Sequence, residues 1–195
     1  MEKAQKLVDF DGEVHYYEQF IAESRAEMLF NYLENNVLWT NEKVRMFGKL
    51  LELRRKTAWF SLNGDNYKYS GVEHIAQKLD YKLENLRSEV ERVTASTFNS
   101  YLLNYYHDEK DYMGLHKDNE TSMQKGSAIA SVSLGAARTF IMVHQTSQIQ
   151  LQQVLSPGSL LVMKGAFQRF WKHGILKELN PKGPRINITF RLRKE

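Results

Sequence analysis

Residues 128–163 read AIASVSLGAARTFIMVHQTSQIQLQQVLSPGSLLVM, and this stretch decides the fold that the sequence predicts. Short runs rich in β-forming residues alternate there with turn residues such as Gly135 and Pro157-Gly158. Similar runs lie on either side, FNSYLLNYY at 98–106 and RINITFRLR at 185–193. Short strands separated by turns at this spacing predict an antiparallel sandwich or barrel.

The N-terminal part is expected to mix helix and strand. Helical spacing of apolar residues predicts a helix from Ala22 to Val37, and an apolar face of leucines and valines predicts a second over residues 72–94. Residues 44–70 are expected to be extended, with a hairpin turn at Asn63-Gly64-Asp65. Because all prolines lie at 157 or later, no proline-rich linker divides the chain. We therefore expect one α+β, mainly β, unit over residues 1–195.

Composition narrows the possible chemistry. The chain has no cysteine, which excludes a disulfide scaffold, a thiolate nucleophile and a zinc finger, and leaves His, Asp and Glu as metal ligands. The net charge of +4 permits nucleic-acid binding without requiring it. The first residues, MEKAQKLVDFDGE, contain no apolar signal core, and apolar runs such as LLVM at 160–163 are too short for a membrane span. We expect a soluble intracellular protein with no membrane partner.

The segment His116-Lys117-Asp118 is a candidate metal site. In an extended chain, residues i and i+2 point to the same side, so His116 and Asp118 could bind one ion together. Two histidines and one carboxylate on one face form a site typical of non-haem Fe(II), which keeps positions open for substrate and oxygen. His173 is the best third ligand and His144 is its rival. A His-x-Asp triplet also arises by chance, so this pattern alone is weak.

The last predicted strand has an unusual polar face. Arg185, Asn187, Thr189 and Arg191 alternate with apolar residues that belong in a core. Two arginines flanking two small hydrogen-bonding side chains fit a ligand with two carboxylates, although a solvated strand face would look the same. A second polar pair, Asn104 and Tyr106, ends an earlier apolar run and suits the same small dianion, or simply marks where that strand leaves the core.

These residues together resemble the AlkB family of Fe(II)- and 2-oxoglutarate-dependent dioxygenases, which repair alkylated nucleic acid bases. The resemblance rests on Asn104-x-Tyr106, His116-x-Asp118, His173, Arg185-x-Asn187-x-Thr189-Phe190-Arg191, and the segments 129–140, 157–165 and 171–173. The N-terminal half is similar to the animal homologue that prefers duplex DNA, through residues 44–49, Arg55-Lys56 and residues 67–71. Arg54 departs from that relative, which has a proline there.

The resemblance implies a fold and a set of ligands. The fold would be a double-stranded β-helix, or jelly roll, over about residues 98–193, with N-terminal helices and a β-hairpin nucleotide-recognition lid over about 41–71. His116, Asp118 and His173 would bind Fe(II). The cosubstrates would be 2-oxoglutarate and O2, with Arg191 on the side of the C1 carboxylate and Arg185 on the distal carboxylate. The 2-oxoglutarate pocket would be lined by Asn104, Tyr106, Arg185, Asn187, Thr189 and Arg191.

The implied activity is oxidative demethylation of 1-methyladenine and 3-methylcytosine in DNA, with release of formaldehyde and succinate. The target base must be flipped out of the duplex to reach the iron. Such a base is cationic, and therefore suits aromatic stacking and a nearby carboxylate. Tyr69 and Trp171 are candidates for stacking, as is His116 itself, and Glu120 could face the base; each could equally be structural.

Residues 43–56 form a basic segment. They contain six basic residues and one acidic residue, as a phosphate-contacting face would, although a solvated hairpin could have the same composition. Phe47 in this segment could be an apolar wedge that fills the gap left by a flipped base, or plain core. The residues predicted to bind substrate are Phe47, Arg55, Lys56, Tyr67, Tyr69, Glu120 and Trp171.

Two other functions remain open on the sequence alone. One is the same chemistry on RNA or a protein side chain, and the other is a non-catalytic nucleic-acid binding module, which would need neither the metal ligands nor the two arginines. The expected partner is DNA, duplex in the first place and single-stranded as an alternative. We expect a monomer, located in the cytoplasm if the source is bacterial and in the nucleus if it is eukaryotic.

Overall fold

The computed structural model describes residues 4–46, 49–69, 72–78, 80–180 and 182–194. The α-helices are α1 (Glu23–Asn36), α2 (Tyr81–Thr94) and α3 (Phe167–Phe170). The strands are β1 (Gln5–Val8), β2 (Glu13–Tyr17), β3 (Thr40–Met46), β4 (Lys49–Ser61), β5 (Tyr67–Tyr69), β6 (Val72–His74), β7 (Ala76–Gln77), β8 (Ser100–Tyr106), β9 (Met113–His116), β10 (Ile129–Gly135), β11 (Arg138–His144), β12 (Gln150–Leu155), β13 (Leu160–Lys164), β14 (Trp171–Ile175) and β15 (Arg185–Arg191).

Two antiparallel sheets form the body of the protein. The major sheet has the order β1-β2-β13-β10-β15-β8-β4-β3, with β7 added beside β4, and the minor sheet has the order β12-β11-β14-β9. The core of this arrangement sets β13, β10, β15 and β8 against the strands of the minor sheet, as expected for a jelly roll. β5 and β6 form a separate two-stranded ribbon.

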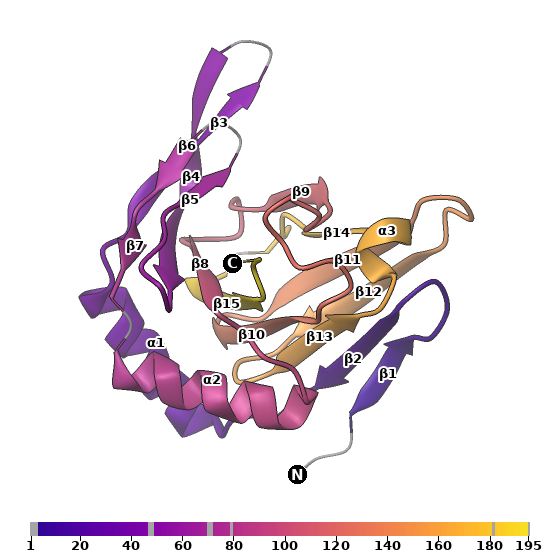
Figure 1. Cartoon of the computed structure of the whole chain (residues 1–195), viewed down its shortest axis with the longest axis horizontal. Coiled ribbons are helices and arrows are strands. Elements are labelled where there is room, and N and C mark those ends of the chain that lie inside the picture. Colours follow the sequence, from indigo (N-terminus) through magenta and orange to yellow (C-terminus); the bar gives the residue numbers. More distant parts are fainter. Residues whose placement is uncertain (1–3, 47–48, 70–71, 79, 181, 195) are drawn as a thin grey trace.

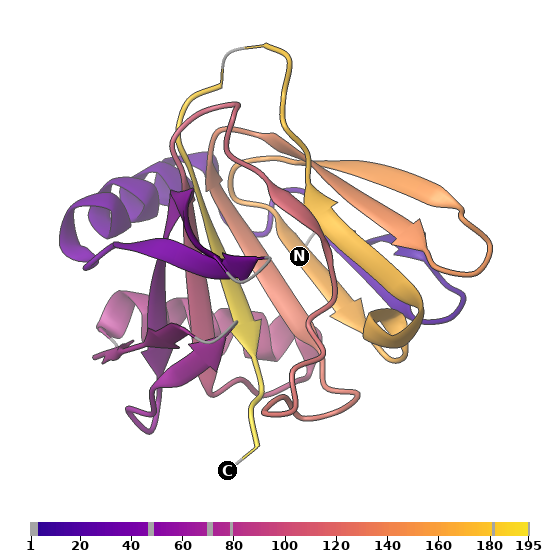
Figure 2. The same ribbon diagram turned by 90° about the horizontal axis from the view of Figure 1, so that it is seen from above.

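Apolar side chains fill the space on both sides of the major sheet. One cluster lies between the sheets and includes Ile129, Phe140 and Met163. The other packs α1 and α2 against the outer face of the major sheet, through residues such as Leu33 and Leu86. In both views these helices lie on the opposite side of the molecule from the orange strands of the minor sheet (Figures 1 and 2). The cluster between the sheets is formed mainly by strand residues, with Phe167 of α3 added to it.

The two predicted helices differ in how well their bounds were placed. The helix predicted from Ala22 to Val37 is confirmed as α1. The helix predicted over 72–94 begins only at Tyr81, because Asp80 caps it by accepting hydrogen bonds from the backbone N–H groups of Lys82 and Leu83. Residues 72–77 before this cap form β6 and β7 instead of helix.

Among the described residues of the segment 44–70, the predicted extended structure is confirmed in β3, β4 and β5, but the predicted hairpin is wrong. Asn63 and Gly64 do form a turn after β4, yet β4 pairs with β3, β7 and β8, and β5 pairs with β6. The hairpins in this region are therefore β3–β4 and β5–β6. Figure 1 shows the β3–β4 hairpin rising away from the two sheets. Among the described helices, none is long and apolar enough to cross a bilayer.

Candidate active site

His116, Asp118 and His173 meet between the sheets. His116 ends β9, and it pairs directly with His173 of β14 in the antiparallel ladder. The Nε2 atom of His116 lies 3.8 Å from Asp118 Oδ1, and Nε2 of His173 lies 3.7 Å from Asp118 Oδ2. The three residues each offer a ligand atom within 4.8 Å of the others. This facial arrangement of two imidazoles and one carboxylate suits Fe(II).

The rival ligand His144 lies elsewhere. Its Nε2 atom is 3.1 Å from Asp11 Oδ2, and its Nδ1 atom accepts a hydrogen bond from the backbone N–H of Ser147 at 3.1 Å. Its ring packs against Phe10 and Trp171. His144 is therefore a buried structural residue at the β11 turn, and His173 completes the cluster.

Backbone geometry holds the three ligands in place. The Nδ1–H group of His116 donates to the carbonyl oxygen of Gly114 at 2.9 Å, which leaves Nε2 free to bind a metal. The backbone N–H of Asp118 donates to Oε1 of Gln168 at 2.9 Å. Gly174 follows His173 where β14 meets β9, and a Cβ there would lie 2.5 Å from the Met113 carbonyl oxygen. Only glycine lets the two strands approach this closely.

Charge and burial keep the ligands in their metal-binding protonation states. Burial raises the pKa of the Asp118 carboxyl, but Arg191 and the two histidines lower it by more, so the pKa falls below its usual value. Arg191 Nη2 donates to Asp118 Oδ1 at 2.7 Å. Burial is also the main reason that the pKa of His173 falls to about 3. At neutral pH the pair is thus a carboxylate and a neutral imidazole.

A polar pocket adjoins the three ligands. Hydrogen bonding between β8 and β15 places Asn104 opposite Asn187 and Tyr106 opposite Arg185. The structure therefore brings all the residues predicted to bind 2-oxoglutarate to one pocket with the metal ligands. These residues are Asn104, Tyr106, Arg185, Asn187, Thr189 and Arg191. Apolar side chains close the pocket from the other sheet, including Phe140, Leu155 and Ile175.

Arg185 is the deepest cation of this pocket. It is 1% exposed, donates to Ser133 Oγ at 2.9 Å, and holds its guanidinium 5.2 Å from the centre of the Tyr106 ring. Its Nε and Nη1 groups have no hydrogen-bond partner among the described residues. Burial lowers its pKa to about 10, so it stays charged at neutral pH. A buried cation with two donors unused suits a carboxylate ligand.

The remaining pocket residues form a connected network. Asn187 donates to Ser131 Oγ at 2.6 Å, and Thr189 donates to Asn187 Oδ1 at 2.9 Å. Ser131 and Ser133 were missed from the sequence, although they are small polar residues two apart in an otherwise apolar strand. Gln168 was also missed, and no local pattern marks it.

The comparison with known proteins identifies the family. A model of the "2OG-Fe(II) oxygenase superfamily" matches residues 13–191. The chain is 35% identical to "DNA oxidative demethylase ALKBH2" of Mus musculus over 188 residues, 90% of this chain and 78% of that protein. It is 33% identical to the Homo sapiens protein of that name over 186 residues, 90% of this chain and 71% of that one. The chain belongs to the AlkB family of 2OG-Fe(II) oxygenases.

One further curated relative agrees with this, and one solved structure shares the fold. "Alpha-ketoglutarate-dependent dioxygenase alkB homolog 3" of Mus musculus is 34% identical over 184 residues, 90% of this chain and 64% of that protein. The solved structure of OsALKBH1 aligns with a TM-score of 0.70 at 14% identity, covering 98% of this chain and 100% of that one. The second similarity concerns the fold alone, and confirms the predicted jelly roll.

As a member of the AlkB family, the protein is a dioxygenase that uses Fe(II), 2-oxoglutarate and O2. The side chains fit these groups. The cluster of His116, Asp118 and His173 suits the metal, and the unused donors of Arg185 suit a carboxylate of the cosubstrate. Bound iron and 2-oxoglutarate supply the oxidising chemistry, and the protein positions and shields it.

The residues predicted to bind substrate have different outcomes. Glu120 lies beside the pocket, with Oε1 4.0 Å from Arg191 Nη1. Lys56 is half-buried on β4. Tyr67 and Tyr69 lie on β5, whose side chains are not among those described, and Phe47 lies outside the described residues altogether.

Two of the substrate predictions conflict with the structure. Trp171 is 0% exposed and stacks on Phe167, so it is a core residue on which no flipped base could stack. The Arg55 guanidinium is buried, donating to Asn104 Oδ1 at 3.2 Å and to the Tyr112 carbonyl at 3.3 Å. It therefore points into the protein, away from any phosphate at the surface. Both corrections concern long-range packing that a local pattern does not contain.

Proposed function

We propose that the protein repairs N-methylated bases in DNA by oxidative demethylation. The targets would be 1-methyladenine and 3-methylcytosine, flipped out of the helix, and the products would be formaldehyde, succinate, carbon dioxide and the repaired base. The observation that carries this proposal is the cluster of His116, Asp118 and His173 beside the buried Arg185. The similarity to relatives named DNA oxidative demethylases supports DNA as the substrate.

Each pocket residue has a role in this proposal. Arg185 holds the distal carboxylate of 2-oxoglutarate, because it is more deeply buried than Arg191, the other cation of the pocket. Arg191 orients Asp118 through its 2.7 Å hydrogen bond and faces the C1 carboxylate. Phe140, Leu155 and Ile175 exclude water from the reacting end of the pocket.

The substrate base would enter from the side of Glu120. That carboxylate lies beside Arg191 and has part of its side chain exposed. A methylated adenine or cytosine carries a positive charge, so a partly desolvated carboxylate would favour it over an unmodified base. Tyr69 remains the predicted stacking partner.

The proposal is tested by incubating the protein with Fe(II), ascorbate, 2-oxoglutarate and oligonucleotides that carry 1-methyladenine or 3-methylcytosine. Duplex DNA, single-stranded DNA and RNA of one sequence are compared, and the mass of each oligonucleotide is measured. Loss of a methyl group from DNA supports the proposal. Loss from RNA alone would assign the same chemistry to another substrate. Unchanged masses with the iron site occupied would overturn it.

The predicted wedge has its own test. Phe47→Ala should lower demethylation of duplex DNA and leave that of single-stranded DNA nearly unchanged, because only a duplex leaves a gap that needs filling. An equal loss on both substrates would assign Phe47 to the core instead.

A further inference from the structure

The β3–β4 hairpin leaves the major sheet at Arg54 and Arg55. The ladder between β4 and β8 runs from Ser61 to Lys56 and ends there. Residues 49–52 of β4 pair only with β3 among the described strands, and the β3–β4 register shifts just before the ladder with β8 begins. A two-stranded hairpin is marginally stable by itself, so its orientation depends on contacts at its base.

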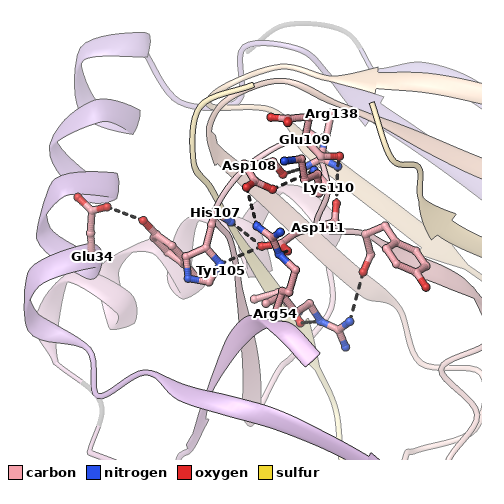
Figure 3. A network of polar contacts seen from close by, with 12 residues as sticks. Glu34, Arg54, Tyr105, His107, Asp108, Glu109, Lys110, Asp111 and Arg138 are labelled. Atoms are coloured by element: carbon pink, nitrogen blue, oxygen red, sulfur yellow. Dashed lines mark hydrogen bonds and ion pairs between the residues drawn. The ribbon is translucent and has the colours of Figure 1, made fainter. Parts of the chain in front are cut away.

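Arg54 makes such a contact with the connection between β8 and β9. Its Nη2 group donates to Asp108 Oδ2 at 2.6 Å, and its Nε group donates to Asp111 Oδ1 at 3.0 Å (Figure 3). Although Arg54 is partly exposed, the Asp111 side chain is fully buried. The Asp111 carboxylate is therefore held in one position, whereas both side chains of an ordinary surface ion pair are mobile.

The connection itself is anchored to the core. Arg138 is fully buried, and its guanidinium donates to the carbonyl oxygens of Asp108 at 3.0 Å, Asp111 at 2.6 Å and Leu176 at 2.8 Å (Figure 3). Asp111 Oδ2 also accepts the backbone N–H of His107 at 2.8 Å. The two carboxylates that Arg54 contacts are thus rigidly placed.

The same connection leads to the active site. It joins β8, which carries Asn104 and Tyr106, to β9, which carries His116. Arg55, the neighbour of Arg54, donates to Asn104 Oδ1 and to the carbonyl oxygen of Tyr112. The base of the hairpin is therefore held at two consecutive arginines by β8 and the connection that leads to the iron ligands.

We infer that Arg54 is a positioning residue, which sets the orientation of the β3–β4 hairpin through Asp108 and Asp111 and so raises affinity for the nucleic-acid substrate without contacting a phosphate. This inference rests on the proposed function for its substrate. It assigns one cation of the basic segment at 43–56 to the protein's own carboxylates. The competing assignment is a phosphate contact.

A positioning role and a phosphate contact for Arg54 predict opposite effects of Asp108→Asn on the affinity for DNA. Asp108→Asn removes one of the two charged partners of Arg54 and should weaken binding to a methylated duplex. Arg54→Ala removes both contacts and should weaken binding more, about fivefold. The double variant should bind no more weakly than Arg54→Ala alone, because that variant has already lost both contacts. Glu109→Gln is the matched control, because it removes one negative charge from the same turn and has no contact with Arg54. A phosphate contact would instead make Asp108→Asn bind more tightly, like the control.

Salt dependence gives a second readout. If Arg54 only positions the hairpin, the slope of log affinity against log salt stays the same in Arg54→Ala. A phosphate contact would reduce that slope by about 1. Unequal slopes, or additive effects of the two substitutions, would overturn the inference.

Amide hydrogen exchange separates this inference from the proposed function, because it needs neither DNA nor iron. Arg54→Ala and Asp108→Asn should speed exchange in the β3–β4 hairpin, and Glu109→Gln should not. Unchanged exchange in both tether variants would overturn the inference even if the enzyme repairs DNA. Faster exchange would support the tether even if no methylated DNA were a substrate.

Discussion

The pocket between the sheets and the β3–β4 hairpin are built in opposite ways. In the pocket, Arg185 and Asn187 lie on β15, which is hydrogen-bonded to β8 on one side and β10 on the other. In the hairpin, residues 49–52 have a paired strand on one side only, among the described strands. The side chains of the pocket, which need accurate positions, are on a strand that is hydrogen-bonded on both sides. The side chains expected to contact a nucleic acid are on a hairpin that projects from the sheet. The difference predicts that substitutions in the pocket affect chemistry and those in the hairpin affect affinity.

His173→Ala should have the largest effect. It removes a buried metal ligand, so both Fe(II) affinity and demethylation should fall by more than about a hundredfold, beyond the loss seen for outer-shell partners of a metal. Fe(II) affinity is measured under anaerobic conditions. His144→Ala serves as the control, since its loss should lower stability and leave Fe(II) affinity unchanged. Equal losses of Fe(II) affinity in the two variants would mean that His173 acts only through folding.

Arg185→Lys should come next. Lysine keeps the charge but cannot make a bidentate pair with a carboxylate, so the KM for 2-oxoglutarate should rise about tenfold. The KM for the oligonucleotide should stay the same, which separates the pocket from the hairpin. Initial rates at varied concentrations of each substrate test both statements, and a rise confined to the oligonucleotide KM would contradict the assigned role.

Lys56→Ala tests the role of the β3–β4 hairpin in binding DNA. If this half-buried residue at the start of the β4–β8 ladder contacts a phosphate, affinity for DNA should fall about threefold and its salt slope should fall by about 1. The KM for 2-oxoglutarate should not change. Binding is measured by fluorescence anisotropy at several salt concentrations, and an unchanged slope would leave Lys56 with no phosphate contact.

The pH dependence of stability should show the smallest effect. Burial lowers the pKa of His74 on β6. The unfolded chain therefore takes up a proton at this residue more readily than the folded chain does, and the free energy of unfolding should fall as the pH drops through about 6.5. His74→Gln should reduce this slope by at most about 1.4 kcal/mol per pH unit, the limit for one proton. Urea unfolding at pH 7.5 and 5.5 measures it, and identical slopes would contradict the burial effect.

The site residues that could be predicted from the sequence are those that local periodicity places on one face of a strand. The period of two in β15 placed Arg185, Asn187, Thr189 and Arg191 on one face, and the structure brings that face to the pocket. The prediction that His116 and Asp118 bind one ion rested on the same period of two, and the structure brings their side chains together. The choice between His173 and His144 needed the pairing of β14 with β9, which lies outside any local window.

The errors share a long-range cause. Trp171 was predicted to stack on the substrate base, but Phe10, which lies far from it in sequence, packs against its ring. Residues 72–77 looked helical by composition, but they add strands beside β4 and β5. Arg54 looked like one more surface cation, because the acids that bind it come from a turn more than fifty residues away. Asp80 is the exception, since an N-cap signal was present in the sequence.

The strand β9 lies at the open edge of the minor sheet, and it is registered with β14 only at His116 and Met113. A ligand that binds only the folded form stabilises that form. A metal bound to both His116 and His173 would therefore stabilise the pairing of β9 with β14. In iron-poor conditions β9 should be the first segment to detach, exposing unpaired backbone groups and Met113, which packs against the apolar cluster between the sheets. Iron supply would then govern how long the protein survives in solution as well as how fast it works.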